Sequence, residues 1–488
     1  MNSFATIRFA LLTVVLAAVA AACGRAETPA PVAAPLQAPG PADETRPNVL
    51  FIVADTMRAD RIGDVRNGNP VMPKMTEFAA QTWNFRRCTV QATWTKPSMV
   101  SMFTSLYPEV HKVLFGPFEA TAGGQPAKVD SVPAELEMLA AYLRSNGYST
   151  AGVQSNVNLH SEFGFGQGFN TYYCEDYPGF TADRVTDKAL AAIEKLSPPF
   201  LCYAHYMDTH APYQPPEAHC EGFGPAPVLP ESDRALLKDY FGFYSDLVEF
   251  QVGLASQRKF GNLTPEGEEH IRYKYDGGAH FVDAECTRLI DAVKKKFPNT
   301  VVVFTSDHGE ELFEHGSVGH GKTVYEELTH VPLLIQGVDT AARSIDARVE
   351  SVDILPTLAS LLGLPARAWW QGRNLAASEA LPADRTVYSA TRTSKATSKV
   401  DFEAVIQGEL KLITDNSLGS NLLFDLKSDP DELKPLEGQH ETIVALSAKL
   451  DAHHERCSAH PIAKLSGQSV SVDTEMLERI RSIGYPGK

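Results

Sequence analysis

Four side chains that lie far apart in this sequence have the types needed to activate a hydroxyl nucleophile. Thr95 stands two residues before Pro97, which opens an amphipathic helical run, and helix N-termini attract anions through unpaired N–H groups. Asp55 ends the apolar run NVLFIVAD, and Asp307 and His308 end the run TVVVFTSDH. Two carboxylates and an imidazole suit a divalent cation, with Thr95 as a fourth ligand. Such a cation would lower the pKa of the hydroxyl and make it a nucleophile.

The two apolar runs must bring these groups together. Both are continuous and rich in β-branched residues, which is typical of strands buried on both faces of a parallel sheet with helices on each side. Ligands bind beyond the carboxyl ends of such strands, so Asp55, Asp307 and His308 are expected to meet at one edge. Taken alone, Thr95 would be interpreted as a helix N-cap. The two acid-terminated strands favour the catalytic interpretation.

From Asn48 to its C-terminus the chain resembles the sulfatase family of the alkaline phosphatase superfamily. Sulfatases carry a C/S-x-P-S-R motif whose first residue is converted to formylglycine, and the matching run here is Thr95-Lys96-Pro97-Ser98-Met99. Threonine cannot become formylglycine, and methionine replaces the arginine. A threonine at this position instead resembles the branches of the superfamily that act on phosphate esters.

The residue pairs expected to bind metal also differ from those of typical sulfatases. Sulfatases usually show Asp-Asp and Asp-Asn pairs, which suit calcium. This chain has Asp55-Thr56 and Asp307-His308. An imidazole ligand favours manganese, zinc or iron over calcium. We expect one divalent ion, held by Asp55, Thr95, Asp307 and His308.

The resemblance also implies substrate-binding residues. His210, the last histidine of the stretch 200–216, and Lys322 are expected to contact the transferred group, and His320 is expected to protonate the leaving oxygen. Asn156 stands where sulfatases carry sulfate-gripping side chains, so it is a candidate pocket residue or part of a turn. Asp208 could position His210 or help hold a second metal, but its spacing to His210 does not match two-zinc relatives.

The N-terminus predicts export. Residues 1–22 have a positive start and an apolar core too short for a comfortable membrane span, as in a signal peptide. The run Ala20-Ala21-Ala22-Cys23 resembles a bacterial lipoprotein box, with ordinary signal cleavage as the alternative. Residues 23–46 are rich in Ala and Pro and are expected to be a tether. The prediction is a protein of the bacterial periplasm or cell envelope, anchored to a membrane by lipid on Cys23.

Composition and pattern set the domain organisation. The chain has 488 residues, 43% of them hydrophobic, which is ample for a large core, and its net charge of −16 argues against a nucleic-acid partner. We expect a catalytic domain over 47–390, with 217–270 as an insertion that forms a lid or specificity wall. Residues 391–488 are expected to form a C-terminal subdomain with a small antiparallel sheet. Cys202 and Cys286 are expected to be core thiols, and no disulfide is predicted.

The prediction from sequence is an α/β protein with a mostly parallel, sulfatase-like sheet flanked by helices. Its function is a metal-dependent hydrolysis of sulfate or phosphate esters, with Thr95 favouring phosphate and phosphonate esters. Two alternatives stay open: a transferase that passes a phospho-group to a lipid or glycan, and a non-catalytic binding protein. The sequence does not specify the small-molecule, glycan or lipid ester, or the oligomeric state.

Overall fold

The computed structural model describes residues 40–116, 127–234, 263–337, 340–377, 381–392, 400–465 and 467–482. The predicted signal peptide, Cys23 and the tether up to residue 39 lie outside these described residues. So do residues 235–262 of the predicted insertion. None of the described helices has the length and apolarity to cross a membrane.

Nine of the described strands form one large sheet, in the order β13-β4-β12-β9-β1-β8-β6-β7, with β14 also paired to β4. The strands are β1 (Asn48–Ala54), β4 (Trp83–Thr89), β6 (Ser149–Gln154), β7 (Thr171–Cys174), β8 (Phe200–Tyr206), β9 (Thr300–Thr305), β12 (His330–Gln336), β13 (Arg343–Ile345) and β14 (Val349–Glu350). β1 is parallel to β8 and β9, and β6 is parallel to β7 and β8. Only β12 runs antiparallel to its neighbours, β4 and β9, within the described sheet. The mostly parallel sheet predicted from the sequence is confirmed.

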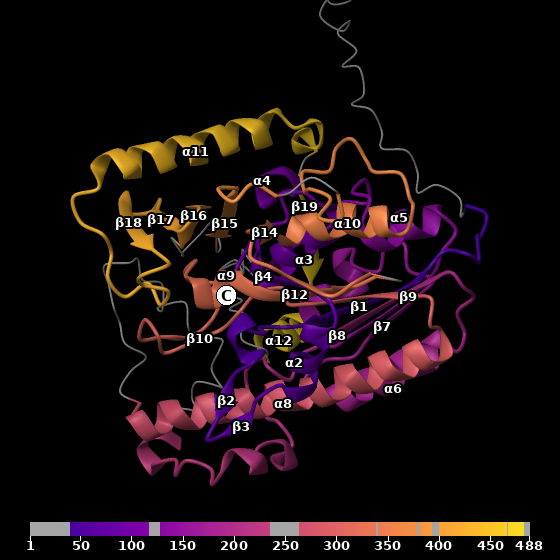
Figure 1. The fold of residues 1–488 in the computed structure, drawn as a ribbon, viewed down its shortest axis with the longest axis horizontal. Coiled ribbons are helices and arrows are strands. Elements are labelled where there is room, and N and C mark those ends of the chain that lie inside the picture. Colours follow the sequence, from indigo (N-terminus) through magenta and orange to yellow (C-terminus); the bar gives the residue numbers. More distant parts are fainter. Residues whose placement is uncertain are drawn as a thin grey trace, which may run out of the picture. The chain divides into compact units, whose positions relative to one another are not determined.

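Helices cover both faces of this sheet because its central strands are apolar on both sides. Alternate residues of β1 enter two separate cores, Val49 and Phe51 one of them and Leu50 and Ile52 the other. Figure 1 shows α3, α5 and α10 on one side of the sheet and α6 and α8 on the other. The first face is covered by α3 (Thr95–Thr104), α4 (Pro108–His111), α5 (Leu139–Ser145) and α10 (Ile354–Leu361). The second is covered by α2 (Pro73–Ala80), α6 (Ala182–Ile193) and α8 (Pro265–Lys296).

Helix α8 begins inside the predicted insertion. Thr264 caps it by accepting a hydrogen bond from the Gly267 N–H, and Pro265 takes the first helical position. Ahead of it, residues 217–223 form two short 3-10 helices, η4 (Glu217–His219) and η5 (Glu221–Phe223). A lid role for 217–270 stays a prediction.

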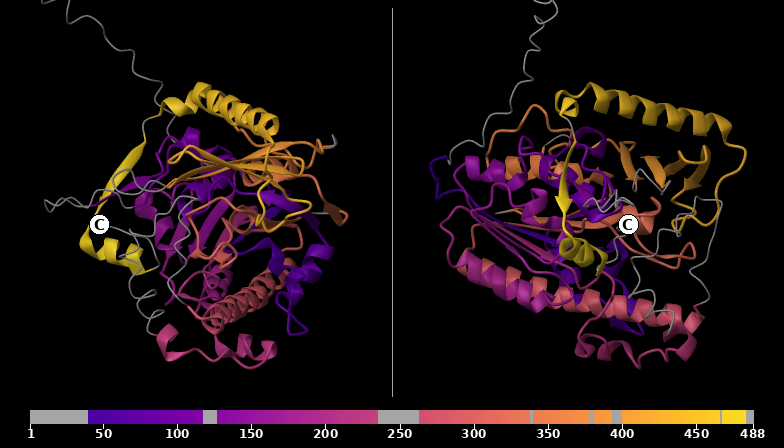
Figure 2. Two further views of the ribbon diagram at one scale, coloured as in Figure 1. Left: turned by 90° about the vertical axis from the view of Figure 1, so that its left-hand side faces the viewer. Right: turned by 180° about the vertical axis from the view of Figure 1, so that it is seen from behind.

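A small antiparallel sheet follows, as expected for the C-terminal subdomain. Its strands are β15 (Thr386–Arg392), β16 (Asp401–Gln407), β17 (Leu410–Asp415) and β18 (Ser420–Asp425). The first strand lies across the predicted boundary between residues 390 and 391. Helix α11 (His440–Ala459) packs on β16 and β17. Figure 2 shows β19 (Gln468–Val472) and α12 (Thr474–Ser482) on the far side of the molecule from the viewer of Figure 1, where β19 pairs with β5 (Ala127–Ser131).

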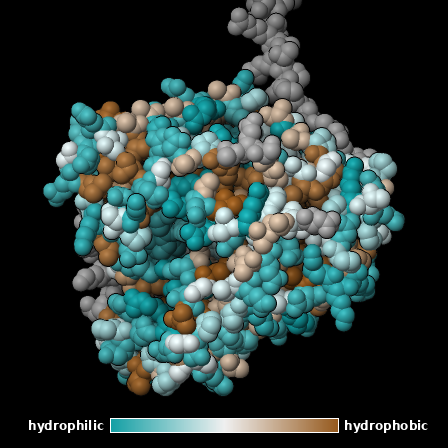
Figure 3. Space-filling view, in the orientation of Figure 1, coloured by the Kyte–Doolittle hydropathy of each residue, from teal (hydrophilic) through white to brown (hydrophobic). Residues whose placement is uncertain are grey.

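The remaining described elements are short. They are η1 (Ala59–Arg61), β2 (Val65–Arg66), β3 (Asn69–Pro70), η2 (Val157–Leu159), η3 (Ser161–Phe163), β10 (Glu311–Leu312), β11 (Val318–Gly319), α9 (Glu326–Thr329), η7 (Ser351–Asp353) and η8 (Pro461–Lys464). On the face shown in Figure 3, hydrophilic residues predominate and hydrophobic ones are scattered among them.

Candidate active and metal-binding site

Thr95 lies buried at the start of helix α3. The helix begins at Thr95 itself, and its N-cap residue is Trp94, which makes no side-chain capping bond. The N-cap interpretation of Thr95 is therefore wrong. Its hydroxyl instead lies 3.5 Å from Oδ2 of Asp55 and 3.4 Å from Nε2 of His308. The strand ends and the helix start meet as the sequence predicted.

Asp55 follows strand β1 and has one anchored and one open oxygen. Oδ2 accepts hydrogen bonds from Nδ2 of Asn156 at 2.7 Å and from Nε2 of His205 at 3.0 Å. Oδ1 is buried and accepts no hydrogen bond. Burial works against the charged form, but the His205 hydrogen bond and the neighbouring histidines hold the pKa of Asp55 below its usual value. The carboxylate is fixed in orientation, and one oxygen is left for another partner.

Asp307 follows strand β9 and shows the same arrangement. Oδ1 accepts the backbone N–H groups of Thr56 at 3.3 Å and of His308 at 3.0 Å, whereas the buried Oδ2 accepts none. Thr56 has a φ of 57°, which β-branched residues rarely adopt, and this conformation aims its N–H at Asp307. Burial and the Asp55 carboxylate raise the pKa of Asp307 well above its usual value. Two neighbouring buried carboxylates repel each other when both are charged, and a cation bound between them would offset this repulsion.

The open atoms have the spacing of ligands around one ion. Nδ1 of His308 donates to the Gly309 carbonyl at 2.9 Å, so Nε2 is the nitrogen left to face the site. Nε2 lies 3.7 Å from Oδ1 of Asp55 and 3.4 Å from Oδ2 of Asp307. Ligands with bonds of about 2.0 Å in a tetrahedral site are about 3.3 Å apart. The donor set therefore fits a single divalent cation.

His205 also belongs to the candidate metal cluster, with Asp55 and Asp307. Its Nε2 bonds Oδ2 of Asp55, and its Nδ1 lies 2.6 Å from the Tyr203 hydroxyl. With both nitrogens engaged, His205 is placed to orient Asp55. No role for His205 was predicted from the sequence. It stands opposite Val53 in the parallel pairing of β1 and β8, on the face that Asp55 continues.

The predicted histidines lie side by side. The His320 ring centroid is 4.3 Å from that of His308 and 4.9 Å from that of His210. Nδ1 of His210 donates to the next backbone carbonyl at 2.7 Å. Nδ1 of His320 lies 2.9 Å from Oε2 of Glu310, a buried residue whose pKa is raised to about 7 by burial. Glu310, which the sequence analysis did not single out, thus fixes the orientation of His320.

The structure also places three other residues named from the sequence, Asn156, Lys322 and Asp208. Asn156 donates to the Thr95 hydroxyl at 3.2 Å as well as to Asp55. Lys322 donates to Oγ of Ser317 at 3.1 Å and to the Val318 carbonyl at 2.7 Å, within the loop that also holds His320. Asp208 is buried, and burial raises its pKa to about 8. The substrate contacts expected of Asn156 and Lys322 stay predictions.

Comparisons with known proteins identify the family of this chain. The Sulfatase family model matches residues 47–364. The chain is 23% identical over 446 residues to the uncharacterized sulfatase YidJ of Escherichia coli K12, an alignment covering 80% of this chain and 83% of YidJ.

Two solved structures share the fold. BT4656, in complex with its substrate D-glucosamine-2-N,6-O-disulfate, has a TM-score of 0.67 and 19% identity, and the match covers 86% of this chain and 100% of BT4656. The phosphonate monoester hydrolase of Agrobacterium radiobacter has a TM-score of 0.67 and 20% identity, covering 88% of this chain and 100% of the hydrolase.

Fold and site together define a hydrolase of the alkaline phosphatase superfamily. The chain belongs to the sulfatase family. It is an enzyme of the class that hydrolyses sulfuric or phosphoric esters. Enzymes of this family depend on metal, and the cluster around Asp55 and Asp307 is where the described residues could hold an ion.

Proposed function

We propose that this protein is a metal-dependent esterase that cleaves phosphate or phosphonate esters with Thr95 as its nucleophile. The observation that carries the proposal is the buried Thr95 hydroxyl, 3.4 Å from His308 Nε2 and 3.5 Å from Asp55 Oδ2, beside carboxylate oxygens that accept no hydrogen bond. A hydroxyl that served only the helix would cap it or bond an interior carbonyl. The contacts described for this hydroxyl are with the Asp55 carboxylate, the His308 imidazole and the Asn156 amide.

The metal-binding part of the proposal assigns four ligand atoms. They are Oδ1 of Asp55, Oδ2 of Asp307, Nε2 of His308 and Oγ1 of Thr95, and one imidazole among oxygens favours manganese, zinc or iron over calcium. The ion would lower the pKa of the Thr95 hydroxyl and offset negative charge in the transition state. His205 and Asn156 hold Asp55 in place for this role.

The chain's own residues account for the remaining steps. The Thr95 hydroxyl passes its proton to water, its Oγ1 attacks the phosphorus in line, an O–P bond forms, and the bond from phosphorus to the leaving oxygen of the ester breaks. His320, held by Glu310, gives the leaving oxygen its proton, either directly or through water. His210 and Lys322 bind the oxygens that carry negative charge. Water then cleaves the phosphothreonine and frees Thr95.

The choice of phosphorus over sulfur has two supports. Thr95 cannot become formylglycine, the group that lets sulfatases expel sulfate from their covalent intermediate. In addition, solved structures of similar fold include phosphonate monoester hydrolases from Silicibacter pomeroyi and Agrobacterium radiobacter. Sulfate ester hydrolysis is the second candidate, because BT4656 shares the fold and acts on a sulfated sugar.

The decisive experiment compares wild type with Thr95→Ala and Thr95→Ser. Each is assayed with chromogenic phosphate monoester, phosphate diester, phosphonate ester and sulfate ester, with bound metal measured on the same samples. We expect metal-dependent turnover of the phosphorus esters, a loss of at least about 10³-fold in Thr95→Ala, and partial activity in Thr95→Ser. Unchanged turnover in Thr95→Ala would refute the nucleophile, and Thr95-dependent turnover of sulfate ester alone would establish the second candidate.

We further propose export and lipid anchoring at Cys23. The support is the sequence of residues 1–23, with its apolar core and small residues before the cysteine. Fractionation of cells expressing the full chain tests this. Wild type should sediment with membranes and Cys23→Ser should be released, whereas equal distribution of the two would contradict the anchor.

A further inference from the structure

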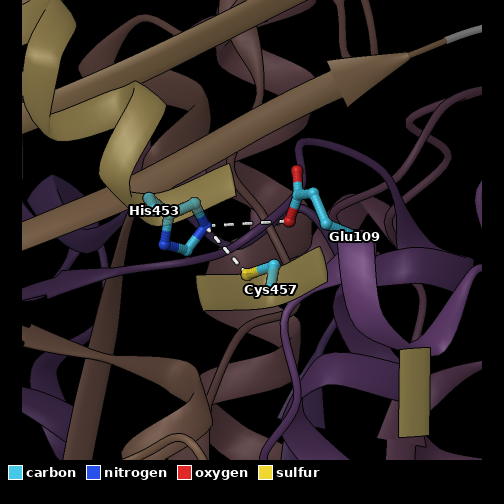
Figure 4. A group of neighbouring side chains, drawn as sticks. All are labelled: Glu109, His453 and Cys457. Atoms are coloured by element: carbon cyan, nitrogen blue, oxygen red, sulfur yellow. Dashed lines mark hydrogen bonds and ion pairs between the residues drawn. The ribbon is translucent and has the colours of Figure 1, made fainter. Parts of the chain in front are cut away.

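A second group of metal-ligating side chains lies outside the active site, between helix α4 and helix α11. Glu109 comes from α4, the short helix that follows the nucleophile helix α3, and His453 and Cys457 come from successive turns of α11. Figure 4 shows the imidazole of His453 facing both the thiol and the carboxylate. His453 and Cys457 are buried. Residues four apart on a helix share a face, so the imidazole and thiol form a ready-made pair of ligands.

The distances point to an ion between these groups. Nε2 of His453 lies 3.6 Å from Sγ of Cys457 and 3.8 Å from Oε2 of Glu109. A ring nitrogen carries either one proton or one lone pair and cannot satisfy both partners at once. Around a tetrahedral zinc ion, with bonds of about 2.0 Å to nitrogen and oxygen and about 2.3 Å to sulfur, N and S are about 3.5 Å apart and N and O about 3.3 Å. The observed separations match such an ion after a small movement of Glu109.

We propose that Glu109, His453 and Cys457 bind a structural zinc ion. A carboxylate and a thiolate neutralise the charge of Zn²⁺, and carboxylate, imidazole and thiolate are all zinc ligands in proteins.

The surroundings hold the three ligands in place. Oε1 of Glu109 accepts a hydrogen bond from Arg392 at 3.0 Å, which leaves Oε2 for the ion. Nε2 of Gln371 lies 3.7 Å from Sγ of Cys457 and can donate to a thiolate. The His453 ring stacks on Tyr388, with centroids 4.0 Å apart, and meets Tyr107 edge-on at 4.5 Å.

Water can supply the fourth ligand. A pocket beside the cluster is lined by Tyr107, Glu109, Tyr388 and His453, among others. The pocket borders two of the three ligands, Glu109 and His453, so a water molecule there would complete the four-coordinate sphere that zinc usually has.

Comparable clusters elsewhere in the described chain have their ligand atoms occupied. His454 bonds Oε1 of Glu403 at 2.9 Å, and that carboxylate also pairs with Arg392. His315 uses both nitrogens, one with Glu327 at 2.9 Å and one with a backbone carbonyl at 3.2 Å. These groups are satisfied as hydrogen-bonded pairs, so we assign the ion to the cluster around His453.

The zinc site would link two parts of the chain that are distant in sequence. Helix α11 covers the small C-terminal sheet, and α4 packs against α3, which presents Thr95. A zinc ion would clamp the C-terminal subdomain to the segment that carries the nucleophile. Because the ion would be bound by the folded chain and not by separate segments, zinc would raise the temperature of unfolding.

Cobalt substitution tests the proposal independently of activity. The full-length metal-free protein is titrated with Co²⁺, and the near-ultraviolet charge-transfer band that arises only from thiolate–cobalt bonds is recorded. The proposed active-site ligands include no thiol, so the band reports a thiolate site outside the active site, whether or not the active site takes metal. We expect the band in wild type, its displacement by Zn²⁺, and its loss in Cys457→Ser, whereas Cys174→Ser should keep it.

Zinc analysis and thermal unfolding complete the test. We expect His453→Gln and Cys457→Ser each to lose one zinc equivalent relative to wild type and to lose the zinc-dependent rise in unfolding temperature. Absence of the cobalt band in folded wild type would overturn the proposal, even if the variants failed to fold. A band that persists in Cys457→Ser would also overturn it, because another thiol would then be the ligand.

Discussion

Two buried pairs of acidic residues in this protein differ in how their oxygens are used. Glu350 and Asp353 are both contacted by Arg385, which donates to Oε2 of Glu350 at 2.8 Å and to the two oxygens of Asp353 at 2.5 and 2.9 Å. The remaining Glu350 oxygen accepts from the Tyr107 hydroxyl at 2.9 Å. In the other pair, Asp55 and Asp307 each leave one buried oxygen without a hydrogen bond.

We interpret Glu350 and Asp353 as carboxylates that stabilise the fold, and Asp55 and Asp307 as carboxylates that bind a ligand in the active site. A buried carboxylate is tolerated when every oxygen is paired, and its hydrogen bonds then lock the surrounding elements. Carboxylates left open, as at Asp55 and Asp307, destabilise the metal-free protein. Their retention makes sense if a ligand completes them, and active sites commonly accept such a cost.

The largest expected effect comes from Asp307→Asn. This change removes a proposed metal ligand and should lower kcat/KM by at least about 10³-fold, because metal-ion catalysis contributes several kcal/mol. It also removes repulsion with Asp55, so the metal-free variant should unfold with a free energy equal to wild type or about 1 kcal/mol higher. The matched change Glu350→Gln should instead cost about 2 kcal/mol of stability, because it weakens bonds to Arg385 and Tyr107. Urea unfolding measures the stability of both variants, and steady-state kinetics measures their activity. Equal destabilisation by Asp307→Asn and Glu350→Gln would contradict the proposed difference between open and paired carboxylates.

Arg385→Met removes the cation that pairs with both Glu350 and Asp353. Glu350 and Asp353 would be left as uncompensated buried charges, which should cost about 3 to 5 kcal/mol in the free energy of unfolding. Turnover per folded molecule should stay close to wild type, since Arg385 contacts neither Thr95 nor the open carboxylates among its described contacts. The exposed Arg373→Met is the control and should stay within about 0.5 kcal/mol of wild type. A loss below about 1 kcal/mol in Arg385→Met would show that the cluster is not a stabilising element.

Metal removal should destabilise the protein through the open carboxylates. An ion at a hundred times its dissociation constant stabilises the folded state by about 2.7 kcal/mol, so a chelator should lower the unfolding temperature of wild type by several degrees. To isolate the active site from the zinc cluster, the comparison is made in a Cys457→Ser background with and without Asp307→Asn. The shift should persist in the first protein and vanish in the second. A shift of equal size in both would place the ion elsewhere.

A smaller effect is expected from pH at His315, a satisfied group like Glu350. Its Nδ1 bonds Glu327, and although burial opposes protonation, this bond raises the pKa of His315 to about 9. The stability that His315 supplies is therefore full below about pH 6.5, the ordinary value, and is lost as the pH rises through about 9. Wild type should lose about 1 to 2 kcal/mol more than His315→Asn between about pH 6 and about pH 10 in urea unfolding. Parallel pH profiles for the two proteins would refute this.

Much of the fold followed from local pattern. The runs before Asp55 and Asp307 predicted two buried parallel strands, and these became neighbours β1 and β9 in the sheet. Residues 391–488 were predicted to contain a small antiparallel sheet, and they hold its strands β16, β17 and β18. Such predictions succeed because strand burial is encoded in the residues of the strand itself.

Other features depend on contacts between distant segments. The exact start of α3 at Thr95 ruled out capping, and this depends on the extended conformation of Trp94 where it enters the site. Lys96 is fully buried with its ammonium on the Asp130 carbonyl at 3.1 Å and over the Phe163 ring, and burial lowers its pKa to about 7. From the sequence alone, a lysine directly after Thr95 would be expected at the surface, because the residues it contacts lie elsewhere in the chain.

The sequence by itself determined the sheet class, the family and the meeting of Asp55, Thr95, Asp307 and His308, because parallel strands deliver their carboxyl ends to a common edge. Only the tertiary structure decided which oxygen of each carboxylate is open, that His205 bonds Asp55 and Glu310 bonds His320, and that Glu109 and Cys457 come together from two helices. The reason is physical: hydrogen-bond saturation is a property of the three-dimensional neighbourhood, and its members are hundreds of residues apart along this chain.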